Sequence, residues 1–532
     1  AGAQATVAGP ARAGEGRRGW EPRPAGRLAA EMWVGCAIGV LLRLLLYLAG
    51  VPAYLEEHLE LNTPMTSYLR LREGLFLLDI GASPYAGDAC HNPPLVLWLF
   101  RLSGAAPSLT HFLLVVAADV ATALLLRLLA VQYAGARAKA GKSWAEAAVR
   151  LPELAEDGTP KEAPTATSSA ASALEDVVSP AFVGLSYLLN PFVIASCLAQ
   201  SLQNFQHVAL SAAVCLAGSG RMGPTAAALA LSLYLCPFIT AMLLLPCAYL
   251  CFVARGQAGP EAPAKAGGYE EYSRSQDGVV LEPGLCGHVL RFFVAVLLLL
   301  FCLLGASAAS MGGDLGFLQA CFASILELRD LTPNVGIYWY IFIEVFDRYR
   351  GLFLLAFHGH VAFYTLPLHL RLGRHRPIGP WLHCTAAVGI VTMFKPYPTA
   401  SDFGLMLSML LIQAELIRAS EQLFAFLLSG LLFGLCMFPT MTAVWLGRNA
   451  GNANFLYNMT LVINVFGCLL LTEWVRAGMK LRRREHLAAF CRGVVLDVVE
   501  GAMSKQAAPA ATDAAAAGGG AEANEEGLRK RR

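Results

Sequence analysis

The chain has 532 residues, of which 56% are hydrophobic and 15% are charged, and its formal net charge is +2. Soluble domains carry roughly a quarter charged residues, so this composition favours a lipid bilayer over water as the main solvent. The small net charge, without a basic face interleaved with aromatic residues, argues against nucleic acid as a partner. The 14 cysteines stand singly, without metal-ligand or disulfide spacing, so no metal or cofactor is predicted.

Residues 1–31 are rich in Gly, Ala, Pro and Arg and lack the apolar periodicity of a packed element. We expect a disordered leader here and a native start at Met32, immediately before the first apolar block; a disordered cytosolic tail is the alternative. Residues 33–50 are long enough to cross a membrane, which takes roughly 20 residues. N-terminal sequencing of the mature protein distinguishes the two interpretations of the leader.

The rest of the chain alternates between apolar blocks and short polar connections. The blocks cover residues 108–133, 178–199, 205–218, 224–254, 288–308, 336–370, 381–394, 403–417, 422–446 and 453–475. We therefore expect an all-α polytopic membrane protein with about ten to twelve transmembrane helices in a membrane domain spanning 32–480.

Three basic segments, at 137–142, 371–376 and 480–484, set the predicted orientation. Lys and Arg in short loops are retained in the cytosol, so we place all three segments and both termini there. Residues 51–92 and the loop around 310–335 then lie in the lumen.

Three stretches are of low complexity: the inserts 134–173 and 255–284, and the tail within 481–532. Their Ala, Gly, Pro and charged residues give no basis for a packed core. We expect solvated or cytosolic inserts and a cytosolic, largely disordered tail.

A luminal motif follows the first span: residues 71–100 read LREGLFLLDIGASPYAGDACHNPPLVLWLF. The order of Asp79, Gly81, Tyr85 and His91 resembles the first luminal loop of the PIG-U family of glycosylphosphatidylinositol (GPI) transamidase subunits. Similar blocks follow in the same order at 187–197, 330–347, 363–372, 394–402 and 451–465. The resemblance covers about residues 33–480; the leader, the inserts and the tail depart from it.

The resemblance implies a location, an architecture and a role. The location is the endoplasmic reticulum membrane, and the architecture is similar to that of the GT-C membrane glycosyltransferases, with a structured first luminal loop. The role is that of a non-catalytic subunit which binds and presents the GPI lipid for attachment to proproteins with a C-terminal signal. The partners are the other transamidase subunits, including a caspase-like chain that carries the catalytic Cys and His.

An active GT-C mannosyltransferase that uses dolichol phosphate mannose is the alternative. Such an enzyme needs a carboxylate in the first luminal loop, commonly an Asp-x-Asp or Glu-Asp pair. Here Gly81 stands where the second acid would follow Asp79, and Asp88 is the nearby substitute. A secondary transporter would need paired broken helices in an inverted repeat, and the sequence shows no second copy of its glycine and asparagine segment.

Cys90 and His91 raise the question of a nucleophile and base. Neighbours in sequence point in divergent directions, whereas catalytic pairs meet from separate parts of a chain. We therefore predict no catalytic residue in this chain. Asp79, Tyr85 and His91 remain as the motif of the first luminal loop.

Ionisable residues inside apolar blocks are costly and face a cavity or a partner. Arg43 and Arg127 can carry their charge to an interface, and Asp119 can pair with one of them. Glu344 sits among aromatic residues in YWYIFIEVFD and is a candidate lipid contact. Lys395, in the rigid FKPYP break, either contacts a lipid phosphate or belongs to a plain interhelical turn.

The segment 447–458, GRNAGNANFLYN, concentrates asparagines beside two glycines. Amide side chains donate and accept hydrogen bonds, so they suit sugar hydroxyls and phosphates. Asn454 and Asn458 share a face of a regular helix, and convergence of Asn452 with Asn454 requires a non-helical opening. The alternative is that Asn452 caps the last span. These positions match the asparagine pair of the family block, so the resemblance favours a GPI-binding site at Asn452, Asn454 and Asn458.

Overall fold

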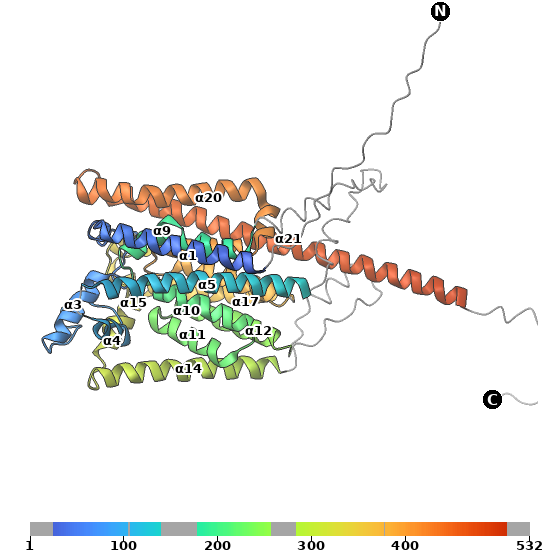
Figure 1. Cartoon of the computed structure of the whole chain (residues 1–532), viewed down its shortest axis with the longest axis horizontal. Helices are drawn as coiled ribbons and strands as arrows, with labels where there is room; N and C mark the ends of the chain where they lie inside the picture. The colour runs from blue at the N-terminus through green and yellow to red at the C-terminus, as the bar shows by residue number, and fades with distance from the viewer. Residues whose placement is uncertain (1–24, 105–106, 140–177, 257–283, 377, 508–532) are drawn as a thin grey trace, which may run out of the picture.

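The computed structural model describes residues 25–104, 107–139, 178–256, 284–376 and 378–507. Within these ranges the chain folds into helices and contains no β-strand. Most helices run nearly parallel to one long direction (Figure 1). This arrangement confirms the predicted all-α fold.

Six helices of the described ranges are long and apolar enough to cross a membrane. They are α1 (Ala25–Leu48), α5 (Leu109–Lys139), α14 (Leu285–Ser310), α17 (Asp347–Leu368), α20 (Ala414–Thr442) and α21 (Ala453–Ala507). The π-helical turns η3 (His369–Gly373) and η4 (Ala443–Gly447) extend α17 and α20. The chain is therefore a multi-pass membrane protein.

The remaining apolar blocks form shorter or broken helices. The block 178–199 divides into α8 (Pro180–Leu188) and α9 (Pro191–Leu198), which are bent by 46°. The others are α4 (Pro94–Ser103), α10 (Gln203–Gly218), α11 (Met222–Leu235), η1 (Ile239–Leu243), α12 (Leu244–Ala254), α18 (Gly379–Phe394) and α19 (Ala400–Leu411). The described residues therefore give six full-length candidate spans, or seven if the bent α8–α9 pair is one span, where ten to twelve were expected. Breaks at Asn190 and around Phe238 shorten helices that composition alone joins into long blocks.

The ends of several helices differ from the predicted boundaries. Helix α1 begins at Ala25, upstream of Met32, and α5 extends into the first expected insert as far as Lys139. Helix α21 continues to Ala507, well beyond the expected start of the tail at 481. The other residues of the leader, most of both inserts and the end of the tail lie outside the described residues.

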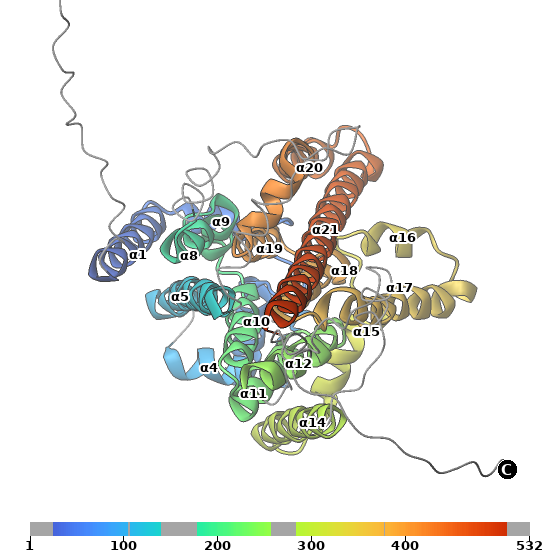
Figure 2. The same ribbon diagram turned by 90° about the vertical axis from the view of Figure 1, so that its right-hand side faces the viewer.

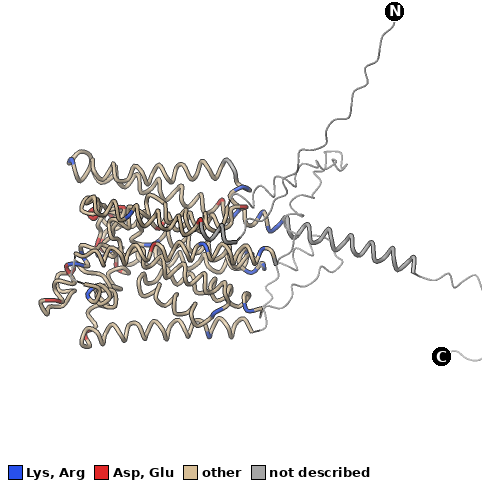
Figure 3. The backbone as a smooth tube through the Cα atoms, in the orientation of Figure 1, with Lys and Arg blue, Asp and Glu red and all other residues tan. Residues whose placement is uncertain are grey.

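The two ends of the bundle differ in charge. Lys and Arg gather at one end (Figure 3), which we call the basic end. There the Arg482 guanidinium donates to the Arg371 carbonyl at 2.6 Å, and Arg137 lies 3.7 Å from the Glu415 carboxylate. The described residues of the three basic segments therefore lie at one end of the bundle, and their cytosolic location stays a prediction. The opposite end, formed by residues 51–92 and 312–337, is called the loop end.

The interior of the bundle contains α10, α18 and α19, and around them lie α1, α5, α14, α17 and α20 (Figure 2). All residues of α18 from Gly379 to Met393 are buried. Small residues bring neighbouring helices together, as they do in other membrane proteins. At Gly184 of α8 an added Cβ would lie 2.5 Å from the Ala123 carbonyl oxygen of α5. These two helices can approach so closely only because residue 184 has no side chain.

Candidate functional site

The first motif loop is held at the loop end by hydrogen bonds to backbone carbonyls. It contains α2 (Val51–Leu55) and α3 (Tyr68–Asp79). The buried His91 ring contacts the Ala320 carbonyl through Nδ1 at 2.7 Å, and the Tyr85 hydroxyl donates to the Asn92 carbonyl at 3.0 Å. Both motif residues thus fix the loop against the protein.

Asp79 lies at the exposed C-terminal end of α3. Within the part of the chain that the structure describes, it shares no contact partner with Tyr85 or His91. Its carboxylate pairs with Arg101 at 3.2 Å. The pair lies on the rim of an open polar cavity of about 770 Å³, which Arg72 and Glu73 also line. The two carboxylates at this cavity, Glu73 and Asp79, lie six residues apart on α3, whereas those of an Asp-x-Asp pair lie two residues apart.

Cys90 does not have the surroundings of a nucleophile. The side chain is 1% exposed, and burial raises the pKa of its thiol to about 11. A reactive cysteine needs a lowered pKa and an adjacent base, but the neighbouring His91 ring is bound to the Ala320 carbonyl. The thiol is therefore protonated at neutral pH.

Lys395 lies in a buried polar network and not on a surface. Its Nζ contacts Asp402 Oδ2 at 2.9 Å and Oδ1 at 3.0 Å, Gln203 Oε1 at 2.7 Å and Gln206 Oε1 at 3.2 Å. Asp402 also accepts from the Thr399 backbone N–H in a capping box that starts α19. Lys395 is only 3% exposed, so its ammonium is fully used within the protein.

A second buried ion pair continues this network towards α1. The Arg43 guanidinium donates to Asp119 Oδ2 at 2.9 Å, which confirms that Asp119 pairs with one of the two arginines. The Tyr187 hydroxyl lies 3.4 Å from Asp119 and 2.9 Å from the His207 ring, whose other nitrogen lies 3.2 Å from Asp402. Each buried cation in this network has a buried anion beside it, as low-dielectric surroundings require.

The asparagine segment does open into non-helical backbone. The π-helical turn η4 ends at Gly447, and α21 begins at Ala453. Between them Asn449 and Gly451 adopt positive φ angles of 51° and 86°. The Asn452 side chain accepts from the Asn454 backbone N–H at 3.0 Å, so the capping role considered for Asn452 is present.

Asn454 and Glu344 are brought together by Tyr340, although they come from distant parts of the chain. The Tyr340 hydroxyl on α16 (Tyr338–Glu344) donates to the Asn454 side-chain oxygen. Glu344 lies four residues after Tyr340 on the same helix, and its carboxylate interacts electrostatically with the Tyr340 hydroxyl. Both Asn454 and Glu344 are exposed, so the bond lies at the surface of the chain.

Aromatic side chains support this surface from beneath. Tyr340 stacks on Tyr457 with ring centroids 4.4 Å apart, and Trp339 stacks on Trp445 at 6.4 Å. These contacts join α16 to η4 and α21. We call the polar group that they support the shelf. It consists of the half-buried Tyr340 and the exposed Glu344, Arg448, Asn452, Asn454 and Asn458.

Sequence reasoning identified Glu344 and the three asparagines but missed Tyr340 and Arg448. Among the described residues, no side chain bonds to the Arg448 guanidinium. Composition gave no sign that Tyr340 faces Asn454, because four of the seven residues of α16 are aromatic. Arg448 lies between Gly447 and Gly451, outside any helix, and this position in the sequence could have marked it as a candidate site residue.

Comparisons with known proteins place the chain in a family. The family model for GPI transamidase subunit PIG-U matches residues 37–463. The human GPI-anchor transamidase component PIGU is 27% identical over 460 residues, which cover 86% of this chain and 95% of the relative. The GPI transamidase component GAB1 of Saccharomyces cerevisiae is 25% identical over 443 residues, covering 82% and 90%. This chain belongs to the PIG-U family of GPI transamidase subunits.

Proposed function

We propose that this chain binds the GPI lipid on the shelf and presents its terminal amine to a covalent intermediate held by a separate caspase-like subunit. The loop end then faces the lumen of the endoplasmic reticulum, and the basic end and both termini face the cytosol. The three basic segments support this orientation, because short basic loops are retained in the cytosol.

One observation carries the proposal: the Tyr340 hydroxyl donates to the exposed Asn454 side chain, one helical turn from the exposed Glu344 carboxylate. Polar side chains at a membrane surface are expected to meet a ligand or a partner. Amide groups suit hydroxyls, and the Arg448 guanidinium suits a phosphate. The Glu344 carboxylate suits an ammonium group. A sugar lipid with phosphates and amines has all three kinds of group.

Positioning is the contribution to the reaction that we assign to this chain. A lipid held by its head group loses orientational freedom before the reaction, which is a large part of joining two substrates. The protonated Cys90 and the ion-paired Asp79 give no group poised for chemistry of its own. The mannosyltransferase alternative has no specific support in the arrangement of these residues.

The test uses cells that lack their own copy of this subunit and carry variants of the chain. Asn452→Ser combined with Asn454→Ala keeps an oxygen for the helix cap and removes both amides. We expect normal co-purification with the other subunits and a lower rate of GPI attachment to a reporter. The loss of two side-chain hydrogen bonds of about 1 kcal/mol each lowers lipid occupancy by roughly 30-fold when lipid is limiting.

Thr472→Ala is the matched control, because Thr472 is an exposed polar residue on the same helix away from the shelf. Tyr340→Phe removes only the bridging hydroxyl and should lower the rate to a smaller extent. Normal reporter display by the double variant, with the complex intact, would refute lipid binding on the shelf.

A further inference from the structure

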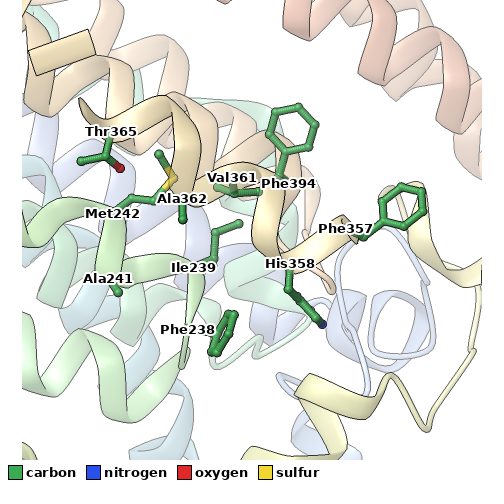
Figure 4. A pocket seen from close by; sticks show the side chains of 10 residues that line it. All are labelled: Phe238, Ile239, Ala241, Met242, Phe357, His358, Val361, Ala362, Thr365 and Phe394. Carbon is green, nitrogen blue, oxygen red and sulfur yellow. The ribbon is translucent and has the colours of Figure 1, made fainter. Parts of the chain in front are cut away.

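An apolar cavity of about 300 Å³ lies between η1 and α17 (Figure 4). Ile239 and Met242 of η1 face Val361 and Ala362 of α17 across it. The volume is at the lower end of the range for ligand sites, roughly 300 to 1,000 Å³. Its lining contains no charged side chain, so it suits a hydrocarbon ligand.

The cavity exists because the chain breaks between α11 and α12. Phe238 has a positive φ of 77°, which ends the regular helix and leads into the 3-10 turn η1. A continuous helix would present a ridge of side chains to α17, whereas the break leaves space. The His358 ring, which also lines the cavity, contacts the Leu326 carbonyl at 3.0 Å.

Helix α16 connects this cavity with the shelf. The Tyr338 hydroxyl lies 3.2 Å from the Phe357 carbonyl and 3.1 Å from the Phe394 carbonyl, and both of these residues line the cavity. Two residues further along α16, Tyr340 belongs to the shelf. A helix with its side chains is about 10–12 Å across, so the polar and apolar sites lie on either side of one short helix.

We propose that the cavity holds one hydrocarbon chain of the GPI lipid whose head group lies on the shelf. The inference rests on the proposed function and adds the binding site for the apolar part of the same ligand. The exposed position of Ala362 on α17, a membrane-crossing helix, lets a chain enter sideways from the bilayer. An amphipathic ligand fits this arrangement because a polar site and an apolar site adjoin.

The test uses the purified complex and two photoreactive probes with the same chain. One is a GPI lipid with a diazirine at the end of one chain, and the other is a phosphatidylcholine with that chain. After irradiation, peptides are identified by mass spectrometry. We expect the GPI probe to label peptides from 238–242 and 357–365, and the phosphatidylcholine probe to label them about tenfold less.

Ala362→Trp fills the cavity and should lower this labelling by about tenfold, which corresponds to about 1.4 kcal/mol of binding free energy. Ala356→Trp is the matched control, because Ala356 is exposed on the same helix and does not line the cavity. Equal labelling by phosphatidylcholine, no labelling of these peptides, or labelling unchanged in Ala362→Trp would overturn the inference. None of these results would contradict head-group binding, which the reporter assay tests separately.

Discussion

Replacing Lys395 with Met should destabilise the protein strongly, because it leaves the buried Asp402 without its counter-ion. The change removes all four contacts of the ammonium group with Asp402, Gln203 and Gln206. Breaking a buried pair by removing one partner costs about 3–5 kcal/mol. Asp402 keeps its hydrogen bonds from Thr399, so we expect a loss near the lower limit, about 3 kcal/mol.

The assay is thermal unfolding of the purified complex, followed by fluorescence-detected size exclusion. Because such unfolding is irreversible, the variants are ranked by their melting temperatures at one heating rate. Lys395→Met should melt first, and the double change with Asp402→Asn should recover most of the loss by removing both charges. Arg329→Met is the control: its pair with Glu327 is 44% and 49% exposed, and exposed pairs contribute at most about 1 kcal/mol. A Lys395→Met protein as stable as Arg329→Met would refute the argument.

Two further predictions concern helix packing and pH. Gly184→Ala should cost about 1–3 kcal/mol through overpacking against α5, whereas Gly223→Ala, where an added Cβ meets no atom within 4 Å, should be neutral in the same melting assay. His58 Nδ1 donates to the Glu60 carboxylate at 2.8 Å, and this hydrogen bond raises the pKa of His58 above 6.5. The stability that the pair adds is therefore fully present below about pH 6.5 and is lost as pH rises through the folded pKa. Melting temperatures of the wild type and Glu60→Gln should therefore differ most at acidic pH and converge at alkaline pH; a constant difference would contradict the pairing.

The apolar blocks predicted the helical fold well but not the lengths of its helices. Hydropathy measures how apolar a segment is, and it does not detect a bend between two short helices such as α8 and α9. Asn190 caps α9 by accepting from the Phe192 N–H at 2.9 Å, and Pro191 follows it, so the break was visible in local sequence. At the second break Pro237 was likewise a local signal, whereas nothing in the residue type of Phe238 favours its positive φ.

The candidate residues were predictable by type, while their grouping was not. Lys395 and Glu344 are both ionisable residues in apolar sequence, yet one is buried in an ion pair and the other is exposed. The capping-box spacing of Thr399 and Asp402 was a clue to the buried pair. The shelf depends on contact between α16 and the start of α21, which only the tertiary structure provides.

The buried pair of Arg43 and Asp119 has a consequence for how the chain is made. Arg43 belongs to the first helix, and its partner follows 76 residues later. At a synthesis rate of about 5–20 residues per second, Asp119 is made roughly 4 to 15 s after Arg43. Since an unpaired arginine is costly at bilayer depth, the first helix must remain in a hydrated or protein-lined environment of the insertion machinery until α5 arrives. We therefore expect α1 and α5 to enter the membrane together.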